Sequence, residues 1–374
     1  MSSEEILVVS GAVIAFRLFD IADTIDLSKA EAVREHQRAN TAITRGRLVS
    51  AAPKALAFGV APLDVPLETV VVGLGETEVR ADASVRLYEF GVARLALRIS
   101  ADNLTWSEFT RRLNAVDQIV GPTSGSDIWR GLLDQVLTTF RSVLVKPPLV
   151  TLEEDYLIGV VRAFDVALDA DALQQRIDLV PLLSGEERRL SEGARRDLLR
   201  QRFSYYTDDL VVLTWDRAFI HEPRGDSDVM DVLDVANARL LEMRYYDQLL
   251  QAELPRMYDL VEAAQRARPL AGSRRYARLA RRLYTLVAEV TEVREKVDNA
   301  LQVTEDVYLA RIYAAALESF RVAAVSASVE RKLAMIRDTY TALYEEASAG
   351  RAALMEAAIV ALIVVEIVLV FVHP

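Results

Sequence analysis

One stretch of this sequence, residues 352–372, stays apolar for longer than any other part of the chain. It reads AALMEAAIVALIVVEIVLVFV, and as a helix its 21 residues would extend about 31 Å, close to the thickness of a bilayer's hydrocarbon core. Two glutamates, Glu356 and Glu366, interrupt the run. The segment is therefore either a membrane anchor or a buried terminal helix in a soluble assembly.

Membrane insertion of residues 352–372 is favoured by a modest margin. Glu366 would lie inside the bilayer, where an acidic residue costs about 2.5–3.5 kcal/mol, whereas thirteen Leu, Ile, Val and Phe residues contribute roughly 4–8 kcal/mol. Glu356 would lie near one interface. Because a carboxyl group inside a membrane usually faces a partner helix, we interpret Glu366 as an oligomer contact and not as a proton carrier.

The charges flanking this segment predict its orientation. Only His373 and Pro374 follow it, whereas four basic residues precede it, namely Arg331, Lys332, Arg337 and Arg351. Positive residues remain on the cytoplasmic side, and the N-terminal MSSEEILVV lacks the pattern of a signal peptide. We expect one C-terminal pass through a bacterial inner membrane or an equivalent membrane, with the N-terminal bulk in the cytoplasm.

Composition limits the chemistry that the chain can perform. Its 374 residues are 52% apolar, which leaves room for two or three domains with real cores. The absence of Cys excludes disulfides and thiolate metal sites, and three scattered His (His36, His221 and His373) argue against a His-built metal site. A net charge of −11 argues against general nucleic-acid binding. No cofactor, metal site or small-molecule substrate is predicted.

Hydrophobic periodicity predicts an α/β region in the first 225 residues. Helices are expected at residues 106–120 and 128–145, and a capping box at Ser28 and Glu31 predicts another, running to about residue 40. Strands are expected over residues 6–19, 68–74, 85–99, 157–164, 210–215 and 218–221.

A weak internal echo suggests a duplication, because RLFDIA at residues 17–22 recurs as RAFDVA at residues 162–167. We therefore predict two α/β lobes, residues 1–148 and 149–225.

The remainder of the chain predicts a helical stalk over residues 226–350, leading into an anchor at residues 351–374. Two apolar seams step by four and three residues, as in a coiled coil: Leu279, Leu283, Leu286, Val290, Val293 and Val297, and Val329, Leu333, Ile336, Tyr340, Leu343 and Ala347. Each seam is under four heptads, so packing within the chain and between chains remain equal alternatives. The fold class expected overall is α+β, with a helical hairpin or coiled-coil stalk and one transmembrane helix.

The order of several short motifs resembles a known family. They lie at residues 88–92, 206–209, 241–247, 306–313, 331–333 and 363–367. In this order they resemble the family named "required for meiotic nuclear division", over roughly residues 80–372. That resemblance implies a membrane-anchored, self-associating protein. Eukaryotic members of that family reside at the mitochondrial inner membrane, where the animal member supports translation. The family offers no accepted catalytic residues, so none are carried over.

Two patterns could carry chemistry or binding. Asp208 and Asp209 precede one expected strand, and His221 with Glu222 ends the next, so a hairpin could assemble a metal or proton-transfer site. Solvated polar ends of a hairpin are the more ordinary interpretation.

Arginines form the second pattern. One group comprises Arg266, Arg268, Arg274, Arg275, Arg278, Arg281 and Arg282, and another Arg188, Arg189, Arg195, Arg196, Arg200 and Arg202. Such groups can bind RNA or lipid phosphates, but salt bridges to the chain's 55 acidic residues are favoured.

These observations leave three hypotheses. The favoured one is a non-enzymatic, tail-anchored scaffold that self-associates and presents its α/β region to a partner. The second is a membrane tether for RNA or ribosomes through the arginine groups. The third is a metal- or nucleotide-dependent hydrolase with its site at the hairpin of residues 208–222.

Overall fold

A computed structural model gives the fold of residues 5–37, 44–45, 56–58, 60–75, 77–124, 126–148, 151–225, 228–265, 278–281, 283–285, 287–288, 290–291, 301–303 and 306–372. The chain divides into two compact units. The sheet unit comprises residues 1–242 and 296–323, and the helical unit comprises residues 243–295 and 324–374.

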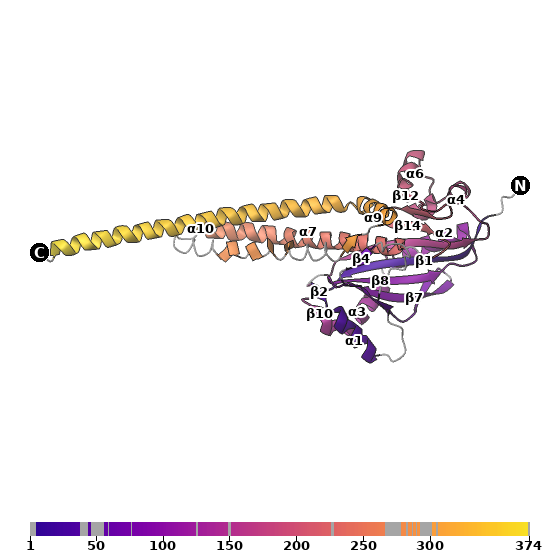
Figure 1. Ribbon diagram of the computed structural model, residues 1–374, viewed down its shortest axis with the longest axis horizontal. Helices are drawn as coiled ribbons and strands as arrows, with labels where there is room; N and C mark the ends of the chain where they lie inside the picture. The colour runs from indigo at the N-terminus through magenta and orange to yellow at the C-terminus, as the bar shows by residue number, and fades with distance from the viewer. Residues whose placement is uncertain are drawn as a thin grey trace. The chain divides into compact units, whose positions relative to one another are not determined.

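The sheet unit is a mixed α+β structure built on an 11-stranded sheet (Figure 1). Its main path runs β12-β13-β14-β11-β1-β8-β7-β5-β3, with β6 paired to β7 and β9 to β1. The pair β11 and β14 is parallel, whereas the other pairs are antiparallel. The strands of this sheet are β1 (Leu7–Asp20), β3 (Thr44–Arg45), β5 (Leu63–Pro66), β6 (Val70–Leu74), β7 (Thr77–Leu87), β8 (Val92–Ser100), β9 (Leu104–Thr105), β11 (Glu153–Phe164), β12 (Arg202–Phe203), β13 (Leu210–Leu213) and β14 (Arg217–His221).

Short ladders and helices complete the sheet unit. Two further ladders pair β2 (Thr24–Ile25) with β10 (Leu144–Val145) and β4 (Leu56–Phe58) with β15 (Leu301–Val303). The α-helices are α1 (Leu27–Gln37), α2 (Trp106–Val120), α3 (Ile128–Phe140), α4 (Ala170–Arg176), α5 (Val180–Ser184), α6 (Glu192–Leu198), the start of α7 (Val229–Gln265), and α9 (Val307–Ser319). A 3-10 turn, Arg141–Val143, follows α3.

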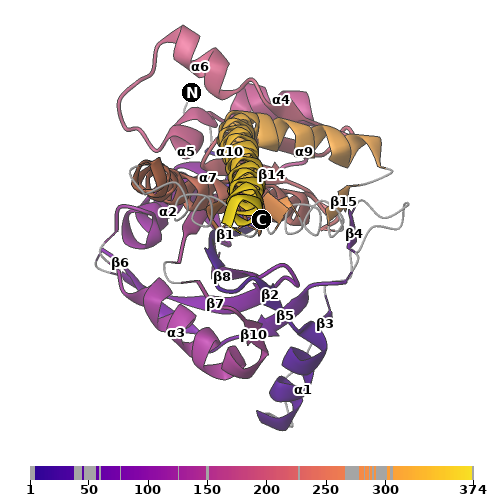
Figure 2. The same ribbon diagram turned by 90° about the vertical axis from the view of Figure 1, so that its left-hand side faces the viewer.

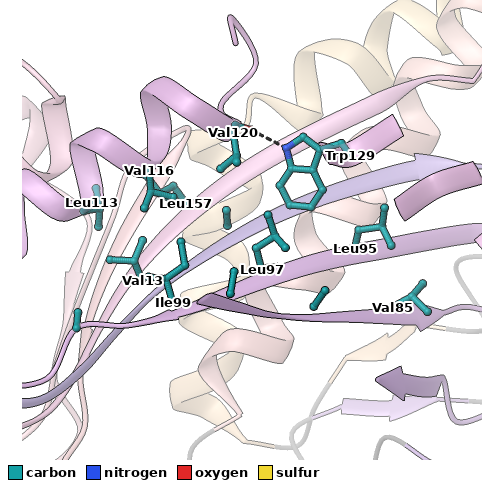
Figure 3. Packing of buried hydrophobic residues seen from close by; sticks show 14 of the residues in the cluster. Val13, Val85, Leu95, Leu97, Ile99, Leu113, Val116, Val120, Trp129 and Leu157 are labelled. Carbon is teal, nitrogen blue, oxygen red and sulfur yellow. Dashed lines mark hydrogen bonds between the residues drawn. The ribbon is translucent and has the colours of Figure 1, made fainter. Parts of the chain in front are cut away.

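Strand β1 is apolar almost throughout because helices cover both faces of the sheet. Its odd-numbered residues, such as Val13, join a core with Leu97 and Ile99 of β8 and with α2 and α3 (Figure 3). In this core the Trp129 indole donates a hydrogen bond of 2.7 Å to the Val120 carbonyl, so a large ring is buried without an unsatisfied N–H.

The even-numbered residues of β1 face the start of α7 and α9. Here the Phe320 ring, just after α9, packs edge-on against Tyr156 at 5.3 Å. Arg94 lies over the Phe16 ring at 4.8 Å, and its Nε donates to the buried Asp234 of α7 at 2.9 Å. Arg86 forms a bidentate pair with Asp64 and also bonds Asp231 and Asp234. This buried ionic network joins α7 to the sheet. Removal of one partner would leave another buried charge without a partner of opposite sign.

Helix α2 has the bounds that the sequence predicts. Its start is a capping box, in which the Thr105 hydroxyl accepts from the Glu108 N–H at 3.3 Å and the Glu108 carboxylate accepts from the Thr105 N–H at 2.9 Å. Gly159 of β11 permits the helix to lie close, because a Cβ there would stand 3.0 Å from Leu113 and 3.2 Å from Phe109.

Three expectations differ from the structure in detail. Strands that the sequence assigns to separate lobes are hydrogen-bonded neighbours in one sheet, with Val13 of β1 opposite Gly159 of β11. The sequence predicts one strand over residues 85–99, but the structure has two, β7 and β8. The chain turns between them at Gly91, whose φ of +96° is a conformation that glycine adopts readily and other residues rarely do. Asp26 and not Ser28 caps α1, accepting from the Lys29 N–H at 3.0 Å.

The helical unit contains the rest of α7, helical residues between 278 and 291, and α10 (Val322–Val372) beyond residue 323. The described seam residues are mostly buried, including Leu283, Val290, Ile336 and Leu343. The side chains of Leu286, Val293, Val297 and Ala347 lie outside the described residues. Helix α10 is one continuous element of 51 residues that passes from the seam into the apolar segment.

A hydrogen-bonded ion pair joins α7 to α10 within the helical unit. Lys332 Nζ donates to the Asp247 carboxylate at 2.9 Å and to the Asp247 carbonyl at 3.1 Å. Burial alone would raise the pKa of Asp247, but the hydrogen bonds from Ser328 and Lys332, with the charges of Lys332 and Arg331, outweigh it and lower the pKa. This pair fixes the register of the two helices at one point of the seam.

Candidate functional site

A cavity of about 490 Å³ opens in the sheet unit beside β12 and α4. Helix α4 lies close to α6 in two perpendicular views (Figures 1 and 2), and β12 lies beside α6 in Figure 1. The cavity is lined by Asp169, Ala170, Asp171, Gln174, Arg202, Phe203, Ser204, Tyr205, Tyr206, Thr207 and Leu210. It therefore combines two carboxylates, one guanidinium and three aromatic rings in a volume suited to a small ligand, about 300–1,000 Å³.

Local hydrogen bonds hold the cavity's two walls. Asp169 caps α4 by accepting from the Ala172 N–H at 2.7 Å, and the Ala170 N–H donates to the Thr207 carbonyl at 2.9 Å. On the other wall, the Tyr205 N–H donates to the Asp209 carboxylate at 2.7 Å. The loop after β12 is thus bonded at both of its ends.

The tyrosines of this loop remain accessible. Tyr205 is 63% exposed and Tyr206 50% exposed, and their rings meet edge-on at 4.8 Å. The Tyr205 ring also lies 5.2 Å from that of Tyr308 on α9. Exposed aromatic rings that contact one another in this way offer faces on which a ligand can stack.

A second cavity of about 400 Å³ adjoins the first. The two share Gln174 and Arg202, and the Arg202 Nη1 donates to the Gln174 Oε1 at 2.9 Å. The second cavity is lined by Gln174, Gln175, Arg176, Ile177, Asp178, Leu179, Arg195, Leu199, Arg202 and Val212. Arg195 bonds both carboxylate oxygens of Asp178 at 3.1 Å, so its charge is already matched there.

The structure brings the hairpin residues of 208–222 to one end of β13 and β14, where Leu210 pairs with His221. His221 is buried, and its Nδ1 lies 3.0 Å from the Val161 carbonyl, which assigns the proton to Nδ1. Burial lowers the pKa of His221, although the Asp208 and Asp209 charges act in the opposite direction. Asp209 is also buried and bonded to Tyr205.

Asp208, Asp209, His221 and Glu222 are not grouped as a set of metal ligands. Among the described residues, no group of three or more His, Asp or Glu side chains is placed to hold a metal ion. The His221 ring packs against Phe164 at 5.0 Å as a neutral core residue does.

Three of the six arginines in the group at residues 188–202 form salt bridges, the kind of contact that the sequence analysis favours. Besides the pair of Arg195 with Asp178, Arg200 bonds Glu318 at 2.6 Å, and Arg189 approaches Glu192 at 3.8 Å. In the other group, Arg278 and Arg281 are described and exposed. The remaining members, Arg266, Arg268, Arg274, Arg275 and Arg282, lie outside the described residues.

The predicted membrane segment belongs to α10, where Glu356 and Glu366 are both exposed. Among the residues that the structure describes, no single helix has the length and apolar composition of a membrane span. One bent pair does, Val307–Ser319 with Val322–Glu345, which meet at 64°.

Comparison with known proteins places the sheet unit in a family. The model of the family described as "Uncharacterized protein MJ0711, N-terminal domain" matches residues 10–228, which is more than half of the chain. The chain belongs to this family. Uncharacterized protein MJ0711 of Methanocaldococcus jannaschii is 29% identical over 192 residues, covering 51% of this chain and 58% of the relative. No solved structure matches the chain significantly.

The resemblance to the "required for meiotic nuclear division" family is therefore wrong. Four of its six motifs lie beyond residue 228, outside the family match, and the structure gives several of their residues ordinary helical roles. Asp306 caps α9, and Asp247 with Lys332 joins two helices. Short charged and apolar motifs of this kind recur in packed helical hairpins. Their order along the chain therefore does not identify the family.

Sequence reasoning missed the cavity at β12 and α4. The motif that pointed near it was Tyr206 to Asp209, and the aromatic pair beside two acidic residues was the available signal. The opposing wall, Asp169 to Gln174, comes from a separate helix, and its approach depends on tertiary structure.

Proposed function

We propose that this protein is a non-enzymatic scaffold that is held at a membrane by residues 352–372, self-associates, and presents its sheet unit to a partner. One observation carries the proposal. Four consecutive apolar residues of α10, Leu362 to Val365, are each between 49% and 68% exposed. Because successive helical residues point about 100° apart, these four occupy every side of the helix.

A helix that is apolar on all sides is buried, either in a protein core or in lipid. The exposed run extends through Ile359, Val360, Ile367 and Leu369. Thirteen Leu, Ile, Val and Phe residues in residues 352–372 favour insertion even with Glu366 inside. Lipid around the helix, with another copy beside Glu366, would cover all of these surfaces.

Because α10 is continuous, an anchor at its apolar segment would also hold the part of the helix that packs in the helical unit. The same helix carries the Lys332 that bonds Asp247, so holding its apolar segment also holds the helical unit. Arg331 and Arg337, both exposed, precede the segment, which supports a cytoplasmic position for the bulk of the chain. Lys332 is engaged with Asp247 and does not serve as a flanking charge.

Membrane fractionation tests the proposal. The full chain should sediment with membranes, resist washing with high salt and alkaline carbonate, and dissolve only in detergent. The variant Ile363→Lys/Val364→Lys should shift to the soluble fraction, whereas Met335→Lys, which adds charge at an exposed site outside the segment, should not. A full chain that is soluble without detergent would refute the anchor.

A second candidate function, RNA or ribosome tethering, is favoured by an exposed aromatic row in the helical unit. Tyr284 is 62% exposed, and its ring lies 6.0 Å from that of Tyr340, which lies 6.1 Å from that of Tyr344. Arg278 and Arg281, on the helical residues just before Tyr284, are exposed. Base stacking on tyrosines next to guanidinium groups is a common way to hold single-stranded RNA.

Charge reversal tests this second candidate. Arg278→Glu/Arg281→Glu should abolish a salt-sensitive association with single-stranded RNA, measured by fluorescence anisotropy. Arg256→Glu/Arg321→Glu is the matched control, with the same charge change elsewhere in the chain. Equal RNA affinity in both variants would exclude the arginine group as the contact.

A further inference from the structure

The cavity beside α4 and β12 is lined by both carboxylates and aromatic rings. Its lining holds the carboxylates of Asp169 and Asp171 and the rings of Phe203, Tyr205 and Tyr206. The lining contains one guanidinium, that of Arg202, which donates to Gln174 where the two cavities adjoin. Within this lining, negative groups therefore exceed positive ones.

The rings of this cavity already attract cations from the chain itself. The Arg224 guanidinium lies over the Tyr206 ring at 4.8 Å, and the Arg311 guanidinium lies over the Phe203 ring at 5.8 Å. Such contacts contribute about 0.5–2 kcal/mol each, depending on how dry the site is. Two of the three rings in the lining thus already have a guanidinium over one face.

The surroundings carry charges of both signs, with Arg224 and Arg311 over two of the rings and further acidic residues beside the loop. Asp208 and Asp209 follow Thr207 of the cavity wall, and the Tyr308 ring lies beside that of Tyr205 at a tilt of 49°. The pKa of Tyr308 is raised first by burial and then by the charges of Asp209 and Glu222, with Asp306 acting in the same direction. Burial is the largest cause of this shift, and the Arg311 charge opposes it, so the acidic residues contribute only a part of it.

We propose that this cavity binds an organic cation, an alkylammonium or guanidinium group that stacks on Tyr205 and Tyr206 and pairs with Asp169 and Asp171. The volume of about 490 Å³ admits a free polyamine or an Arg or Lys side chain of a peptide. The inference goes beyond membrane scaffolding, since it depends only on residues of the sheet unit.

Calorimetric titration of the detergent-purified full chain tests the site with three probes. These are spermidine, the capped tripeptide Gly-Arg-Gly, and Gly-citrulline-Gly, which is nearly the same shape as the arginine peptide but uncharged. Spermidine, the arginine peptide or both should bind, and the citrulline peptide should not. Binding of spermidine alone would identify a free polyamine as the ligand, and binding of the arginine peptide alone would identify a protein side chain.

Variants connect the binding to the cavity. Asp171→Asn and Tyr205→Ala should each weaken it by about tenfold, and Tyr205→Phe should retain it, because the ring face and not the hydroxyl binds the cation. Asp127→Asn removes the same charge from an exposed site on the α3 cap and should leave binding unchanged. Circular dichroism checks that each variant is folded.

Two results would overturn the inference. One is the absence of binding by both cationic probes. The other is an equal loss in Asp171→Asn and Asp127→Asn, which would show attraction to the chain's net charge of −11 and not to the cavity. Neither result bears on membrane association, which the fractionation experiment measures separately.

Discussion

At the scale of single residues, Asp20 is the carboxylate that burial perturbs most clearly. It ends the central strand β1, and its N–H donates to the Leu152 carbonyl at 3.1 Å. Burial, assisted by the nearby charge of Asp23, raises the pKa of Asp20 to about 7. Asp23 itself lies 3.3 Å from Lys146, so its charge is partly matched. At neutral pH, the end of β1 thus carries a half-buried group at its titration midpoint.

This raised pKa predicts a stability that falls as pH rises from about 4 to about 7. In that range the folded state retains a proton on Asp20 that the unfolded chain has released, so folding takes up a proton. The contribution is at most about 4 kcal/mol, from roughly three units at 1.36 kcal/mol each. Asp20→Asn cannot ionise, and in denaturant titrations at several pH values its stability should fall less across this interval.

The control for Asp20→Asn is Asp127→Asn, because the Asp127 side chain is 80% exposed in the unchanged chain. Its pH dependence should follow that of the unchanged chain. Parallel curves for the unchanged chain and Asp20→Asn would show that Asp20 titrates as an ordinary surface carboxylate.

At the scale of elements, the sequence predicted what is decided locally. The bounds of α2 follow from its helical periodicity, with a capping box at its start and a Gly-Pro pair at its end. The pairing of β1 with β11 was not predictable, because Val13 and Gly159 lie far apart in sequence and each strand is an apolar run with no register signal. The cavity at α4 was missed for the same reason, since its two walls come from separate elements.

The capping box of α2 predicts a local stability effect. Thr105→Ala removes the hydroxyl that accepts from the Glu108 N–H and should lower the free energy of unfolding by about 1 kcal/mol. Thr105→Ser keeps the acceptor and should retain most of that stability. Urea titration measures both, and equal losses in the two variants would mean that the methyl group and not the cap is responsible.

The ion pair between Lys332 and Asp247 is expected to stabilise the alignment of α7 against α10 in the helical unit. Lys332→Met leaves the partly buried Asp247 without its ammonium partner and should destabilise the unit by about 1–3 kcal/mol. Because the pKa of Asp247 is lowered, this stabilisation is present above its ordinary value and is lost as pH falls through the lowered one. Hydrogen exchange along residues 324–345 measures the loss.

The double variant Asp247→Leu/Lys332→Met distinguishes charge pairing from packing. If the single variant suffers from an unpaired buried charge, replacing both partners with apolar groups should restore much of the protection. No recovery in the double variant would assign the loss to the packing of the Lys332 stem.

At the scale of the whole molecule, the two glutamates of the apolar segment should differ in what they do. Both lie on one helix, yet Glu366 would lie deep in the bilayer and Glu356 near an interface. A deep carboxyl avoids lipid by facing a polar group of another copy, so Glu366→Leu should weaken self-association while strengthening membrane partition. Glu356→Leu makes the same substitution near the interface, where headgroups and water already solvate the carboxylate, and should leave self-association intact.

Fluorescence energy transfer between labelled copies in vesicles, measured as the density of the copies is varied, separates these outcomes. Weaker self-association in both variants would place the contact elsewhere along α10, and unchanged self-association in both would remove Glu366 from the assembly.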